Sequence, residues 1–79
     1  MSEPSNQDRA RWANNALRVF AATTWNGENS DTMHGEDLEC AIADLVCDLL
    51  HLADQKGLNA QKILWRGNAH FEAELFLDG

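Results

Sequence analysis

The chain has 79 residues, with 13 Asp or Glu against 6 Lys or Arg, so its formal net charge is −7 at pH 7. This length allows one small domain (residues 1–79) with a thin core, and the acidity argues against direct binding to nucleic acid. No apolar run could span a bilayer, and a start without a secretory signal and only two cysteines lead us to expect a cytoplasmic protein.

The first expected helix covers residues 6–24. Ser5 is a candidate N-cap, and Asp8 follows at the spacing of a capping box. Apolar residues recur at the helical period and predict one core-facing stripe: Trp12, Ala13, Ala16, Leu17, Val19 and Phe20. The turn residues Asn26 and Gly27 then open a loop over residues 25–35, with no alternating pattern that would indicate a hairpin.

The second expected helix covers residues 36–55. Acidic residues occupy its first turn, and Lys56 and Gly57 are typical of a helix end. Its core stripe consists of Leu38, Ala41, Ile42, Leu45, Leu49 and Leu52.

The third expected helix covers residues 60–76, with Asn59 as its N-cap. The short connection 57–59 predicts that this helix runs antiparallel beside the second one. Its inward face is predicted to include Phe71 and Leu75, with Gly67 allowing a close approach of a neighbouring backbone.

A second apolar face on the third helix has no obvious cover. It consists of Trp65, Ala69, Ala73 and Phe76. We therefore expect an all-α fold, a small three-helix bundle completed by homodimerisation or by a partner on this face. The alternative is that the loop 26–35 folds back over Trp65.

The acidic excess is confined to residues 26–55, which hold eight carboxylates and no basic residue. One interpretation is a solubilising face; the other is a docking surface for a basic protein partner. The residues predicted for such a surface are Glu28, Asp31, Glu36, Asp37, Asp44 and Asp48.

Cys40, Asp44, Cys47 and His51 form one stripe on the polar side of the second helix, and His70 and Glu74 repeat the one-turn spacing on the third. Cys47 and His51 could share a metal ion, whereas Cys40 lies about 10 Å from Cys47 along the axis. The alternative is that the cysteines are half-buried apolar fillers and His51 a surface residue. We expect no catalytic residue and no cofactor, since neighbours on a regular helix have no oxyanion donors.

The stretch from Ile42 to Asp54, with Gly57-Leu58-Asn59 and the run from His70 to Glu74, resembles a DLxxDLxH…G…H[FY]xAE core over roughly residues 40–74. Short uncharacterised bacterial proteins of plasmids and integrated elements carry this core. The resemblance implies a small helical bacterial protein, encoded on a mobile element, and brings no activity with it.

The run Glu36-Asp37-Leu38-Glu39 is similar to the Glu-x-x-Glu motif of MazG-like all-α nucleotide pyrophosphohydrolases. In that family, a second Glu-x-x-Asp motif completes a magnesium site. Here Ala41 stands at the Glu position before Asp44, and Asp48 follows one turn later. The expected function is a non-enzymatic binding or regulatory protein that acts on a basic partner, such as a nucleic-acid-binding complex. The alternative is a degenerate MazG-like Mg-dependent pyrophosphohydrolase.

Overall fold

The computed structural model describes residues 3–78. Within that range the chain forms three α-helices, α1 (Asn6–Thr24), α2 (Gly35–Gln55) and α3 (Ala60–Asp78), one short 3-10 helix, η1 (Ser30–Thr32), and no strand. The predicted all-α fold with three helices is confirmed, and each helix begins and ends within two residues of the expected position. None of the helices described is long and apolar enough to cross a membrane.

Local hydrogen bonds explain where the helices begin and end. At the start of α1, Ser5 Oγ accepts from the Asp8 N–H and Asp8 Oδ2 accepts from the Ser5 N–H, both at 3.1 Å, which is the predicted capping box. Gly57 follows α2 with a φ of 74°, and the Leu58 N–H donates to the Ala53 carbonyl at 2.9 Å, as in a Schellman motif. Asn59 caps α3, because its Oδ1 accepts from the Lys62 N–H at 3.0 Å.

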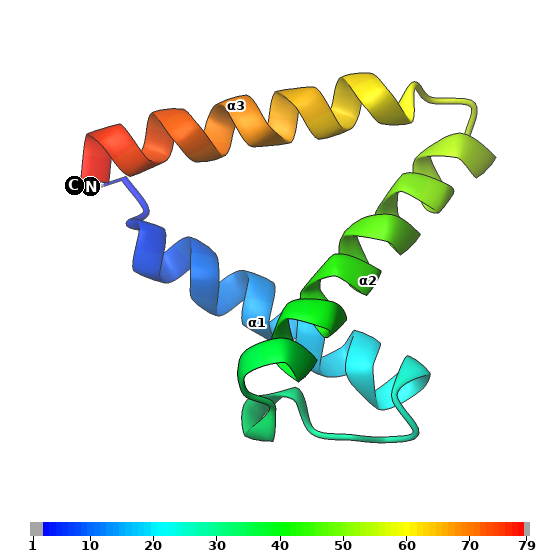
Figure 1. The fold of residues 1–79 in the computed structure, drawn as a ribbon. Helices are drawn as coiled ribbons and strands as arrows, with labels where there is room; N and C mark the ends of the chain where they lie inside the picture. The colour runs from blue at the N-terminus through cyan, green and yellow to red at the C-terminus, as the bar shows by residue number, and fades with distance from the viewer. Residues whose placement is uncertain (1–2, 79) are drawn as a thin grey trace.

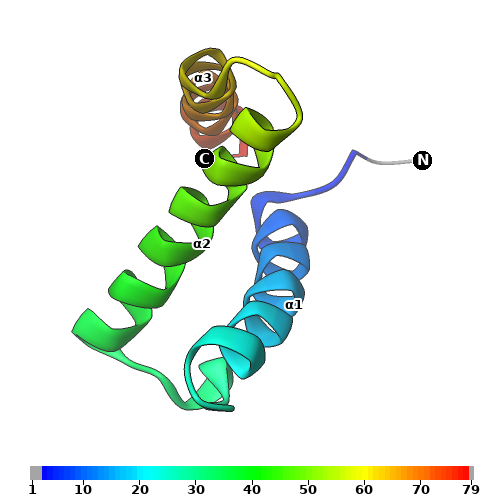
Figure 2. The ribbon, with the colours of Figure 1, turned by 90° about the vertical axis from the view of Figure 1, so that its right-hand side faces the viewer.

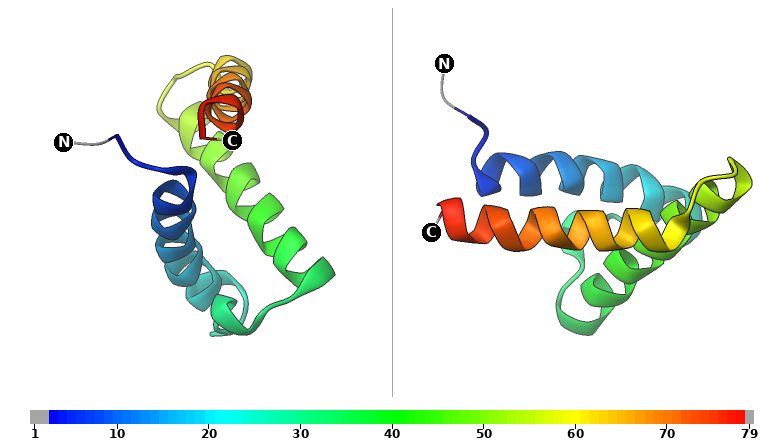
Figure 3. Two further views of the ribbon diagram at one scale, coloured as in Figure 1. Left: turned by 90° about the vertical axis from the view of Figure 1, so that its left-hand side faces the viewer. Right: turned by 90° about the horizontal axis from the view of Figure 1, so that it is seen from above.

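The three helices form the sides of an open triangle (Figure 1). α1 crosses the N-terminal half of α2, α2 meets α3 at residues 53–63, and the end of α3 returns to the start of α1. Figure 2 and the left view of Figure 3 show α3 nearly end-on beside an α2 that is seen along its length, so α3 does not lie along α2. The prediction that α2 and α3 pack as antiparallel neighbours is therefore wrong. The short connection brings their ends together, whereas the conformation after Gly57 sets the direction in which α3 leaves.

The core lies where α1, η1 and α2 meet. It consists of the buried residues Leu17, Ala21, Met33 and Ala41, with Phe20, Trp25, Leu38 and Leu45 packed around them. Met33 places the loop on α1 and α2, and Trp65 remains 72% exposed. The alternative in which the loop covers Trp65 is therefore wrong.

Several residues predicted to face the core are exposed instead. Trp12 and Val19 of α1 are more than half exposed, because they lie well around the helix from the buried Leu17. None of the α3 residues whose side chains the structure describes is buried. Gly67 has no neighbouring atom within 4 Å of where a Cβ would stand, so its predicted role in a close backbone approach is wrong.

Candidate functional site

Four exposed carboxylates define what we call the acidic face of α2: Glu36, Asp37, Asp44 and Asp48. Asp37, Asp44 and Asp48 follow one another at i, i+7 and i+11, which keeps them on one side of the helix. Glu36 and Asp37 also lie in the first turn, where negative charge is favoured by the helix dipole. This face borders the stripe that carries the buried Ala41 and the half-buried Leu45, since Ala41 lies one turn from both Asp37 and Asp44.

The acidic face carries uncompensated charge. No carboxylate of α2 forms an ion pair with another residue of the described chain, since the three arginines of α1 are engaged elsewhere. Arg9 pairs with Glu74, Arg11 with Asp8 and Arg18 with Asp31. The lysines and Arg66 lie beyond the end of α2 and on α3, so the charge separation seen in the sequence persists in space.

Asp31 has a different role from the other predicted docking residues. Its carboxylate accepts hydrogen bonds from Arg18 Nε at 3.1 Å, Arg18 Nη2 at 3.2 Å and Asn14 Nδ2 at 3.2 Å. The bonds from Arg18, and then from Asn14, hold the pKa of Asp31 below its ordinary value of 3.8. Asp31 therefore fastens η1 to α1, whereas Glu28 remains an exposed loop residue outside the acidic face of α2.

Cys40, Cys47 and His51 lie within the same side of α2 as the acidic face. Both cysteines are free and exposed, so the interpretation of them as half-buried fillers is wrong. No group of three or more His, Cys, Asp or Glu side chains in the described chain is placed to hold a metal ion. A metal ion held by Cys47 and His51 stays a prediction, with these two side chains as its only predicted protein ligands.

The carboxylates that resemble the pyrophosphohydrolase motifs are all exposed. At about 100° per residue, Glu39 and Asp44 project about 140° apart around α2. Magnesium held by protein oxygens needs ligands that converge on one point. This single helix does not bring Glu39 and Asp44 together.

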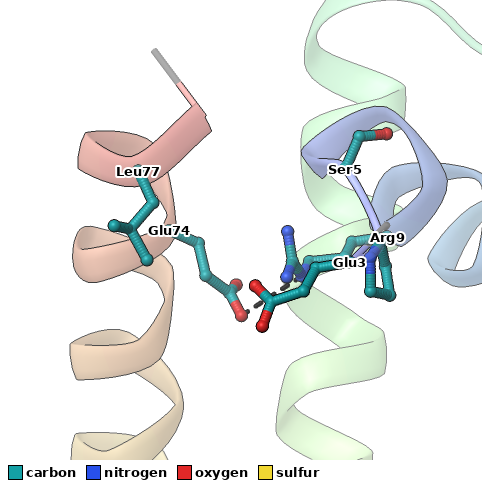
Figure 4. A pocket seen from close by; sticks show the side chains of 6 residues that line it. Glu3, Ser5, Arg9, Glu74 and Leu77 are labelled. Carbon is teal, nitrogen blue, oxygen red and sulfur yellow. Dashed lines mark ion pairs between the residues drawn. The ribbon is translucent and has the colours of Figure 1, made fainter. Parts of the chain in front are cut away.

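Glu74 is engaged at the corner between α1 and α3. Its Oε2 lies 3.2 Å from Arg9 Nε, and its carbonyl oxygen accepts from Asn6 Nδ2 at 3.0 Å. Figure 4 shows Arg9 and Glu74 reaching toward each other beside a groove of about 230 Å³ that Glu3, Ser5 and Leu77 also line. The sequence indicated only the spacing of Glu74 from His70, because the nearness of α1 depends on the direction of α3.

The second apolar face of α3 is open to solvent. Trp65 is 72% exposed and Phe76 92% exposed, and Ala69 and Ala73 lie between them on the exposed side. The structure thus leaves this predicted dimer or partner face uncovered.

Comparison of the chain with models of protein families, with curated proteins and with solved structures finds no match.

Proposed function

We propose that this chain is a non-enzymatic binding protein of the cytoplasm that presents the acidic face of α2 to a basic surface of a protein partner, such as a nucleic-acid-binding complex. The observation that supports this proposal is the set of exposed carboxylates on one side of α2 that form no ion pair with residues 3–78. Such a face raises the rate of encounter with a positively charged partner and disfavours acidic ones.

The geometry of the face favours docking over a general solubilising role. Its carboxylates are concentrated on one side of a regular helix, while every arginine of α1 is held in an ion pair with another acid. A rigid helix also fixes the spacing of the charges, so little conformational freedom is lost when a partner binds.

The test uses a synthetic peptide rich in lysine and arginine as the probe. We expect the double variant Asp44→Asn/Asp48→Asn to bind this peptide about tenfold more weakly at low salt. The matched control is Glu3→Gln/Glu72→Gln, which removes the same charge from exposed positions outside α2 and should change the affinity much less. Fluorescence titration at two salt concentrations measures both. Equal losses in the two variants would mean that only net charge matters, and the proposal would fail.

A further inference from the structure

Three apolar grooves open along the sides of the triangle. One of about 290 Å³ lies between α1 and α2, with Leu17, Ile42 and Leu45 among its lining residues. A second of about 360 Å³ lies at the corner of α2 and α3, where Leu49, Leu52 and Ile63 line it. A third of about 260 Å³ lies between α1 and α3 and includes Phe71 and Leu75.

The helices join these grooves into one surface. Ala10 lines both the groove at α2 and the groove at α3, and a single stripe of α2 supplies the first two grooves. We call this surface the inner face, and we define it by Ile42, Leu45, Leu49 and Leu52 of α2 with Phe71 and Leu75 of α3. Leu49, Leu52, Phe71 and Leu75 each remain 53–57% exposed.

The exposed area is larger than that of a compact folded monomer of the same mass. A folded monomer of 8.8 kDa exposes about 4,800 Å², whereas this chain exposes 6494 Å². Its radius of gyration is 14.0 Å, against about 11.6 Å for a compact domain of this length. The excess is about 1,700 Å² per chain, and two chains together reach the range of obligate dimer interfaces, about 2,000–5,000 Å².

We infer that a second copy of this chain covers the inner face, so that two triangles close each other's grooves. The distribution of charge suits this occupant. The acidic face of α2 borders the inner face, because Asp48 lies three residues after Leu45 and four before Leu52. A second copy on the inner face therefore leaves these carboxylates at the rim, where solvent and salt screen them. The groove at α2 and α3 adds only the cation of Lys56, and Arg9 and Glu74 in the third groove already neutralise each other.

The first test is the size of the full chain by sedimentation and light scattering at micromolar concentration. We expect a particle of twice 8.8 kDa. Thermal unfolding should shift to higher temperature as the protein concentration rises, because association stabilises only the folded state. A mass of 8.8 kDa and a concentration-independent midpoint would overturn the inference and leave the inner face to a different protein.

A matched pair of variants locates the interface. Leu52→Lys/Phe71→Lys adds two charges to the inner face at side chains that are half exposed in one copy, so the helices should still form by circular dichroism. We expect this variant to raise the dimer dissociation constant about a hundredfold or more. Trp65→Lys/Phe76→Lys adds the same charges to the outer side of α3 and should leave the dimer intact. The reverse result would place the second copy on the second apolar face of α3 and overturn the inference.

Discussion

The corner of α1, η1 and α2 differs sharply from the arm formed by α3. The corner contains the buried residues Leu17, Ala21, Met33 and Ala41 and is fastened by Arg18 and Asp31. The arm of α3 has a well-formed cap at Asn59, yet none of its described side chains is buried. Helix propensity and capping thus suffice to define an element, whereas its place in a stable structure depends on what packs against it.

The largest expected effect tests whether the corner alone supports the fold. Leu17→Ala removes the largest buried side chain of the core cluster and should lower the free energy of unfolding by about 3 kcal/mol. Val19→Ala, at an exposed site of the same helix, should change it by less than about 0.5 kcal/mol. Urea unfolding at one fixed protein concentration measures both. Similar losses would mean that Val19 is covered.

A smaller effect sharpens the contrast at the arm. Asn59→Ala removes the N-cap bond to Lys62 and should cost about 1 kcal/mol. Because α3 has few contacts beyond its ends, the loss should appear as faster amide hydrogen exchange in α3. Ser5→Ala is the matched change at the start of α1. If Asn59→Ala accelerates exchange equally in all helices, α3 is an integral part of the core and the contrast is wrong.

A substitution at Ser30, in the corner of α1, η1 and α2, should raise the free energy of unfolding. Its side chain is buried at 3% exposure, and its hydroxyl has no hydrogen-bond partner in the described structure. Ser30→Ala removes this unsatisfied group and should raise the free energy of unfolding by up to about 1 kcal/mol. The comparison variant is Thr32→Ala, which loses an exposed bond from Oγ1 to the Asn29 carbonyl and should not stabilise. A lower free energy of unfolding for Ser30→Ala would show that the Ser30 hydroxyl has a hydrogen-bond partner.

The smallest effect concerns the pH dependence of the corner. Arg18 and then Asn14 lower the pKa of Asp31 in the folded chain. Asp31 therefore contributes fully to the free energy of unfolding above about pH 3.8, its ordinary pKa, and this contribution is lost as the pH falls through its lower pKa in the folded chain. Between about pH 5 and pH 2, the midpoint temperature of thermal unfolding should therefore fall less steeply for Asp31→Asn than for the unmodified chain. Asp8 also has a lowered pKa, because of the Ser5 N–H, then the Ser5 hydroxyl, and Arg11. Asp8 is present in both proteins, so the difference between the two curves reports on Asp31 alone. Parallel curves would contradict this role of Asp31.

The sequence predicts best what neighbouring residues decide. The capping box at Ser5, the left-handed Gly57 and the cap at Asn59 are local signals, and all three are confirmed. The direction of α3 and the burial of Met33 depend on contacts between distant segments, which periodicity does not encode. Met33 was nevertheless the one aliphatic residue of the loop 26–35, and that alone could have indicated its burial.

The same reasoning applies to the candidate site. Exposure and clustering of charge on α2 follow from helical spacing, so the acidic face could be predicted residue by residue. The pairing of Asp31 with Arg18 could not, because it joins a loop to a helix 13 positions earlier. The inner face also escaped prediction, since the stripe on α2 would be equally apolar in a closed bundle.

The bond between Asn6 and the carbonyl of Glu74 joins positions 68 residues apart. Forming it closes almost the whole chain into a ring, and the entropy lost in closing a loop grows with its length. Contacts of the α1–η1–α2 corner span far shorter stretches and should form first during folding. The corner of α1 and α3 is then the last to close and, held by polar contacts at its edge, the first to open.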